Sequence, residues 1–132
     1  MTSNEQVGVR YLVDDVAACV EFYVAQLGFA AGISSPAFAD VTLGNLRVLL
    51  SGPLSSAGRA MEDGEVPRPG GWNRIHLIVD DIETEVARLT AAGVRFRNTI
   101  VSGPGGSQAL AIDPAGNLVD RKSTRLNSSH VS

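Results

Sequence analysis

Two residues that could carry out acid–base or anion-binding chemistry, Arg74 and His76, lie two positions apart in a run of apolar residues. Side chains at this spacing project from the same face of a β-strand. His76 could act as a general acid or base, and Arg74 could stabilise an oxyanion or bind an anionic or carbonyl-bearing ligand. The alternatives are a half-buried histidine satisfied by a neighbour, and an arginine ion-paired with a carboxylate such as Asp80 or Asp40.

The strand that carries these two residues repeats an earlier part of the chain. The sequence Val-Asp-Asp at residues 13–15 recurs at residues 79–81, which is an offset of 66 residues (from 13 to 79). In both copies an alternating apolar segment precedes the motif, a segment with helical spacing follows it, and a glycine (Gly28 or Gly93) ends that segment. A single repeat at this interval indicates a duplicated module rather than a solenoid.

Each copy is predicted to form a strand, a helix and three further strands, which gives an α+β fold of two tandem βαβββ modules. The first module spans residues 7–50, a Gly-, Pro- and Ser-rich linker spans 51–71, and the second module spans 72–119. In the second module, residues 94–101 are predicted as one strand and Leu118 begins the last strand. The predicted core residues are Val9, Tyr11, Val13, Val20, Phe22 or Tyr23, Leu27, Ile75, Leu77, Val79, Val86 and Leu89.

The composition argues against several classes of protein. The 132 residues include 11 basic and 14 acidic side chains, for a net charge of −3, so a nucleic-acid partner is not expected. No apolar run approaches the roughly 18 residues that a membrane span requires, so no membrane association is expected either. The lone cysteine, Cys19, cannot form an internal disulfide and is typical of a reduced, cytoplasmic protein.

The C-terminal segment has a different origin from the rest of the chain. Residues 120–130, DRKSTRLNSSH, match the translation of a common short-read sequencing adapter. We interpret residues 120–132 as a non-natural tail that carries no site, and residues 1–119 as a single natural domain. The chain after about Arg125 is predicted to be disordered. The last strand would then stop at Val119 and leave an edge of the second sheet partly unpaired.

The order and spacing of several short motifs resemble the vicinal oxygen chelate superfamily, which includes glyoxalase I, bleomycin-resistance proteins and extradiol dioxygenases. The matching segments outside the repeated motif are residues 21–23 and 27–29 in the first copy, and residues 92–94 and 113–117 in the second. The resemblance implies that the two modules form a half-open barrel with a cavity on the sheet faces opposite the helices. It also implies a homodimer.

The resemblance implies that residues on the cavity faces of the strands, as alternation places them, are candidate site residues. Arg74 and His76 are the candidate catalytic residues, and the candidate ligand-binding residues are Arg10, Leu12, Arg47, Trp72, Asn73 and Gln108. Trp72 could be a lid or a stacking platform for a ligand, and the alternative is ordinary packing at a strand entry.

Metal-dependent members of the superfamily have His, Gln or Glu at places that correspond here to Gly8, Arg74 and Asp120. Glycine has no donor and a guanidinium stays protonated, while Asp120 belongs to the tail. A metal centre needs three or four converging donors, so we expect no metal and no cofactor.

Two functions remain in competition. The first is a metal-free cavity that binds a small organic compound, as drug-sequestering members of the superfamily do. The second is a metal-independent lyase, isomerase or hydrolase that uses His76 and Arg74. A structural or regulatory dimer subunit is a third possibility.

Overall fold

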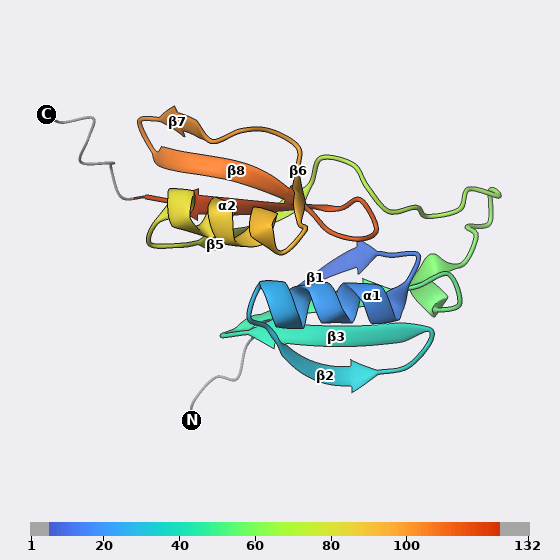
Figure 1. The fold of residues 1–132 in the computed structure, drawn as a ribbon. Coiled ribbons are helices and arrows are strands. Elements are labelled where there is room, and N and C mark those ends of the chain that lie inside the picture. Colours follow the sequence, from blue (N-terminus) through green and yellow to red (C-terminus); the bar gives the residue numbers. More distant parts are fainter. Residues whose placement is uncertain (1–5, 125–132) are drawn as a thin grey trace, which may run out of the picture. The chain divides into compact units, whose positions relative to one another are not determined.

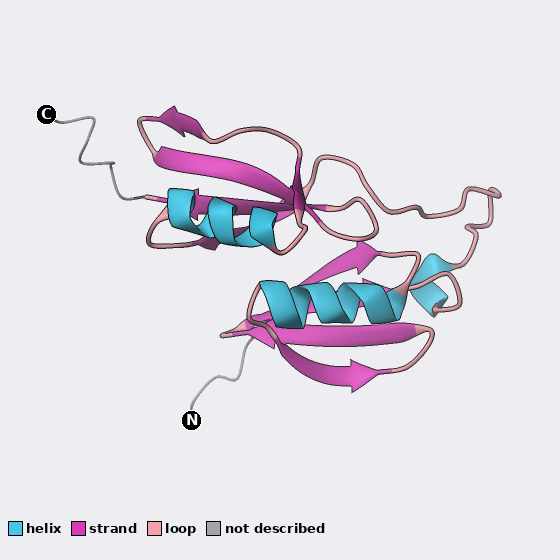
Figure 2. Ribbon diagram, viewed as in Figure 1, coloured by secondary structure: helices cyan, strands magenta, loops and turns pink. Residues whose placement is uncertain are grey.

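The computed structural model describes residues 6–124. It divides into two compact units. The N-terminal unit contains the chain up to Gly71 together with the turn Pro114–Asn117, and the C-terminal unit contains Trp72–Asp113 and the chain from Leu118 onwards. In each unit a helix lies across one face of a β-sheet (Figures 1 and 2). The predicted disorder after Arg125 falls outside the described residues.

The N-terminal unit has a four-stranded sheet with the strand order β1-β4-β3-β2, in which β1 and β4 are parallel and the other pairs antiparallel. Its elements are β1 (Val7–Leu12), α1 (Val16–Glu21), the π-helical segment η1 (Phe22–Gln26), β2 (Ala30–Ser34), β3 (Phe38–Leu43), β4 (Leu46–Ser51) and the short 3₁₀ helix η2 (Ser56–Gly58).

The C-terminal unit repeats this topology. Its strand order is β5-β9-β8-β6, with β7 also paired to β8 and with β5 and β9 parallel. Its elements are β5 (Arg74–Ile78), α2 (Ile82–Ala91), β6 (Arg95–Phe96), β7 (Val101–Gly103), β8 (Gly106–Ile112) and β9 (Leu118–Ser123). The predicted duplication of a βαβββ module is confirmed.

The doubled aspartates of the repeated motif begin the two helices. The carboxylate of Asp15 accepts a hydrogen bond from the backbone N–H of Ala18 at 3.1 Å. The carboxylate of Asp81 accepts hydrogen bonds from Glu83 N and Thr84 N at 3.1 and 3.3 Å. These oxygens satisfy N–H groups that have no partner within the first helical turn, which is why the strand changes into a helix at this motif.

The two helical segments end at glycines, as predicted. Gly28 has φ of 80° and Gly93 has φ of 90°, a left-handed conformation that other residues rarely adopt. The first helical segment differs from the prediction in one respect, because its second half, Phe22–Gln26, is π-helical.

The core of each unit lies between the helix and the sheet. Most of the predicted core residues are buried, and Tyr23 and Leu89 are completely so. Leu50, which was not in the predicted core, is also completely buried. Four of them are only half-buried, namely Val9, Val20, Val79 and Val86.

One predicted strand is divided in the structure. Residues 94–101 form β6 and, after a break, β7, rather than one strand. At the break the side-chain Oδ1 of Asn98 accepts the hydrogen bond from Leu110 N at 2.9 Å, in the place of a neighbouring main-chain carbonyl. A side chain that takes over a ladder position in this way releases its own backbone from the sheet.

The prediction of an unpaired sheet edge after Val119 is wrong. Strand β9 continues through Asp120 and Arg121 to Ser123, and it lies between β5 and β8 rather than at an edge. Asp120 is aligned with His76 on one side and with Leu110 on the other. Main-chain pairing does not depend on the identity of the side chains, so residues 120–123 can occupy these positions whatever their origin.

Candidate functional site

Each sheet has a face opposite its helix, which we call the open face. On β1, Tyr11 is buried beneath α1 whereas Gly8 and Arg10 are exposed. On β4, Val48 is completely buried on the helix side, which leaves Arg47 and its alternating neighbours on the open face. Alternation therefore places three predicted site residues on the open face of the N-terminal unit, namely Arg10, Leu12 and Arg47.

On the open face of the N-terminal unit, both arginines are held by partners. Arg10 Nη1 donates a hydrogen bond to Ser51 Oγ at 2.8 Å. Arg47 Nε donates to Asp40 Oδ2 at 2.6 Å, in an ion pair whose carboxylate is buried. Ser51 and Asp40 were not predicted as site residues. Asp40 was considered only as a partner for Arg74, and the structure pairs it with Arg47 instead.

In the C-terminal unit, Arg74 and His76 are both exposed on the open face of β5, and Ile75 between them is buried. Arg74 Nη1 donates to the carbonyl oxygen of Trp72 at 3.0 Å. Its Nε lies 3.9 Å from Asp120 Oδ2, which is too long for a hydrogen bond. Asp120, which is also aligned with His76, is thus the carboxylate within ion-pair range of Arg74, in place of the expected Asp80 or Asp40.

Trp72 is 61% exposed, and the guanidinium of Arg97 lies 4.5 Å from the centre of its ring. This distance is within the range of a cation–π contact. The indole of Trp72 is thus a largely exposed planar surface in contact with Arg97. Asn73 next to it is exposed, and Gln108 on β8 lines a shallow groove of about 220 Å³ together with Val101, Ser102, Gly103, Gly105, Gly106 and Lys122.

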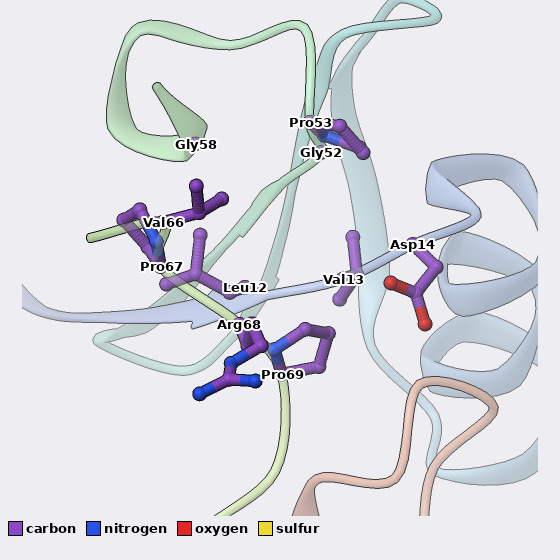
Figure 3. A pocket seen from close by; sticks show the side chains of 10 residues that line it. All are labelled: Leu12, Val13, Asp14, Gly52, Pro53, Gly58, Val66, Pro67, Arg68 and Pro69. Carbon is purple, nitrogen blue, oxygen red and sulfur yellow. The ribbon is translucent and has the colours of Figure 1, made fainter. Parts of the chain in front are cut away.

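The N-terminal unit also contains a pocket of about 190 Å³ at the end of β1 (Figure 3). Leu12 and Val13 form its floor, and the loop segment 66–69 lies over it with Val66 and Pro67 beside Leu12. Its other lining residues are Asp14, Gly52, Pro53, Gly58, Arg68 and Pro69. Pockets for drug-sized ligands measure about 300–1,000 Å³, so this one fits only a small group.

Asn117 fastens the loop that covers this pocket. Its Nδ2 donates to the carbonyl of Leu12, and its Oδ1 accepts from the backbone N–H of Gly70, both at 2.8 Å. Sequence reasoning assigned Asn117 only to a turn and did not predict a role for the segment 66–69. The only available signal was the polar end of the Asp-Pro-Ala-Gly-Asn turn.

The metal-binding places of the superfamily do not fit a metal in this chain. Gly8 has no side-chain donor, Arg74 is a cation, and only Asp120 could coordinate. Among residues 6–124, no three His, Cys, Asp or Glu side chains are grouped so that they could hold a metal ion. The donor set therefore supports no metal-dependent step.

Comparison with known proteins decides the family. The model of the Glyoxalase/Bleomycin resistance protein/Dioxygenase superfamily matches residues 6–120. The chain belongs to this superfamily. No functionally curated protein matches the sequence significantly. Neither α1 nor α2 is long and apolar enough to cross a bilayer, and no other helix in the described part of the chain is.

Solved structures resemble nearly the whole chain. A member from Sphaerobacter thermophilus DSM 20745 is 27% identical with a TM-score of 0.73, over 93% of this chain and 98% of that one. An antibiotic-binding protein from Streptomyces sp. CB03234 is 23% identical with a TM-score of 0.69, over 93% and 98%. A lactoylglutathione lyase from Agrobacterium tumefaciens is 22% identical with a TM-score of 0.68, over 93% and 96%. The structural likeness thus includes both a binding protein and an enzyme.

Proposed function

We propose that this protein binds a small organic compound on the open faces of its sheets without the help of a metal ion. The observation that carries the proposal is the identity of the side chains on those faces. Arg10 and Arg74 are exposed there, and Trp72 stands at the start of β5, whereas the metal places hold Gly8 and a guanidinium. Such residues recognise a ligand by charge and by stacking.

An aromatic or polar heterocyclic compound fits these residues. The exposed indole of Trp72, with Arg97 against it, supplies a planar surface. The antibiotic-binding protein among the structural relatives supports a sequestering role, in which the compound is held and not changed. The proposal includes a cytoplasmic homodimer as the functional form, which light scattering coupled to size-exclusion chromatography would test.

The only tryptophan of the chain provides the assay. We expect aromatic and heterocyclic compounds, with bleomycin and other antibiotics among them, to change Trp72 fluorescence saturably. Treatment with EDTA should leave the dissociation constant unchanged, because no metal is needed. A dissociation constant that rises more than tenfold after EDTA treatment, and recovers with Zn²⁺, would contradict the proposal.

The same samples distinguish binding from catalysis. A sequestered compound is recovered unchanged from the complex, and chromatography after prolonged incubation would show this. Turnover that is lost in His76→Gln would instead favour the metal-independent enzyme, because His76 is exposed on the open face where it could transfer a proton.

A further inference from the structure

Two opposite charges line the pocket at the end of β1 without forming an ion pair (Figure 3). Asp14 and Arg68 both contribute to its lining, and both residues are exposed. Within residues 6–124 neither side chain makes a hydrogen bond or an ion pair, with the other or with any third residue. Both charges are therefore available to a ligand in this pocket.

The remaining side chains of the pocket are apolar. Leu12 and Val13 form the floor, and Val66 and three prolines complete the lining, namely Pro53, Pro67 and Pro69. Val66 is 56% exposed, so an apolar group in the pocket would remove part of its surface from water, which is favourable. The pocket volume is about 190 Å³, and an apolar cavity of about 150 Å³ can hold benzene. A branched aliphatic group or a phenyl group therefore fits.

Close packing fixes the wall that Gly52 and Gly58 contribute to the pocket. A Cβ atom at Gly52 would lie 2.8 Å from Val16 Cγ2, and one at Gly58 would collide with the carbonyl oxygen of Gly52. The buried Ser55 links the same two glycines, because its Oγ donates to Gly52 O at 2.7 Å and accepts from Gly58 N at 3.2 Å. This wall of the pocket is therefore tightly packed main chain.

The segment that covers the pocket is held in place as well. Asn117 hydrogen-bonds both to the end of β1 and to the residue that follows the segment 66–69. Within this segment Arg68 stands between Pro67 and Pro69. A proline ring fixes the φ angle of its residue, so the backbone on both sides of Arg68 has little freedom. The guanidinium is thus attached to the pocket at a fixed point of the main chain.

We infer that this pocket binds a free α-amino acid with an apolar side chain. A simple carboxylate would face the like charge of Asp14 and a simple amine that of Arg68, whereas a zwitterion satisfies both. The ammonium group donates to Asp14, the carboxylate accepts from the fork of N–H groups on Arg68, and the ligand side chain enters the apolar pocket. The inference goes beyond the proposed function, because it uses none of Arg10, Arg74 and Trp72.

L-Leucine and two analogues with the same side chain are the probes for this inference. N-acetyl-L-leucine keeps only the carboxylate charge, and L-leucinamide keeps only the ammonium charge. Each compound is titrated into the full-length protein with labelled methyl groups, and the methyl signals of Leu12, Val13 and Val66 report occupancy of the pocket. We expect L-leucine to bind about tenfold more tightly than either analogue, because each analogue loses one hydrogen bond between charged groups.

Single substitutions assign each charge to its residue. Arg68→Gln should weaken L-leucine binding about tenfold and leave L-leucinamide binding unchanged, which also shows that the fold is intact. Asp14→Asn should weaken L-leucine binding to a similar extent and should not weaken N-acetyl-L-leucine binding. The matched controls are Arg59→Gln, at an exposed arginine of the same linker, and Asp80→Asn, at the counterpart of Asp14 66 residues later (from 14 to 80). Neither control residue lines the pocket, so both variants should bind all three compounds as the parent protein does.

The outcomes separate this inference from the proposed function. Equal binding of L-leucine and its two analogues would overturn the inference, and so would an equal loss of binding in Arg68→Gln and Arg59→Gln. Failure of L-leucine to shift the methyl signals of the pocket would overturn it as well. None of these results bears on the aromatic compounds that Trp72 fluorescence detects, and a negative fluorescence result would in turn leave the amino-acid pocket standing.

Discussion

The last strand of each module has different residues at the same structural position. In the N-terminal unit β4 lies parallel to β1, and Leu50, aligned with Tyr11, is completely buried. In the C-terminal unit β9 lies parallel to β5 in the same way, and Arg121 is the residue aligned with Leu77. A leucine in one module therefore corresponds to a buried arginine in the other.

The helix above each strand differs in a matching way. Cys19 on α1 is completely buried, and Glu85, its counterpart 66 residues later on α2 (from 19 to 85), pairs with both Arg121 and Arg88. Two buried apolar residues in one module thus correspond to a charged network in the other. Replacement of a buried ion pair by apolar residues of similar volume is often neutral or stabilising, so we expect no advantage in stability from the charged arrangement.

Strand β9 also contains buried polar atoms that lack hydrogen-bond partners. Among the described residues, the only buried side-chain atoms without a hydrogen-bond partner are Asp120 Oδ1 and Arg121 Nε. Buried polar atoms are almost always paired in natural structures. Both exceptions fall in the segment that matches the sequencing adapter, which supports the interpretation of residues 120–132 as a non-natural tail. Backbone pairing thus includes residues 120–123 in the sheet, whereas two of their buried side-chain atoms stay without partners.

The largest expected effect comes from removing the recruited strand. Truncation after Asp120 deletes the pairing of Arg121 and Lys122 with β5 and β8, and it exposes the core beneath Leu77. We expect a loss of about 4 kcal/mol or more from a total that is typically about 5–15 kcal/mol. Chemical denaturation would measure the loss, with truncation after Thr124 as the control that keeps β9 complete. Equal stability of the two truncated proteins would show that β9 ends near Val119, as the sequence alone suggested.

The turns that lead into β4 and β9 offer the next comparison. Asn45, before β4, is exposed and contributes its backbone carbonyl to Val7 N, whereas Asn117, before β9, is buried and contributes its side chain to Leu12 and Gly70. Asn117→Ala removes the partner of a part-buried carbonyl and of a backbone N–H, so we expect a loss of about 2 kcal/mol.

Asn45→Ala is the matched control for this variant and should cost less than about 0.5 kcal/mol, as most exposed substitutions do. Thermal unfolding of both variants would measure the difference. If the two losses are equal, the side chain of Asn117 does not hold the loop over the pocket.

Much of the fold could be predicted because its signals are local. Alternation placed Arg10 and His76 on the open faces, and the motif aspartates and terminal glycines marked both helices. The break at Asn98 and the extension of β9 could not be predicted, because each depends on the hydrogen-bonding groups of a neighbouring strand. Asn98 leaves the ladder by bonding to Leu110, and residues 120–123 are polar and carry no strand pattern of their own.

The candidate site was predicted less completely for the same reason. Its arginines were identified from the sequence, but their partners were not, since Asp40 reaches Arg47 only through the register of β3 with β4. Trp72 was assigned a possible stacking role from its position, and its contact with Arg97 emerges only from the fold. Residue type and spacing thus indicate which groups are available, while register decides what they bind.

A substitution that gives β9 a residue of β4 tests the comparison of the two modules directly. Arg121→Leu introduces the residue that β4 has at the same position and removes an unpaired buried Nε, while Glu85 keeps its hydrogen bonds from Arg88 at 3.1 and 2.9 Å. We expect a gain of about 1–2 kcal/mol in the free energy of unfolding. Arg121→Ala is the control, because it removes the charge but leaves a cavity and should not stabilise. A loss of stability in Arg121→Leu would mean that the ion pair is worth more than the apolar contact.

The smallest expected effect is a pH dependence confined to the second module. Burial by itself raises the pKa of Glu85, but hydrogen bonds from Arg88 and Arg121 outweigh it and hold the pKa below the ordinary value of 4.5. A carboxylate whose pKa is lowered by folding stabilises the folded state above pH 4.5, and this contribution is lost as the pH falls through the lowered pKa. Glu85→Gln should therefore flatten the decline in unfolding free energy below pH 4.5, by less than about 1 kcal/mol because the network is partly exposed. Glu21→Gln, an exposed substitution at the end of α1, is the control. On α1 the position that corresponds to Glu85 holds Cys19, so the charged network is not present there. Identical acid profiles for Glu85→Gln and Glu21→Gln would show that the charged network does not distinguish the two modules in solution.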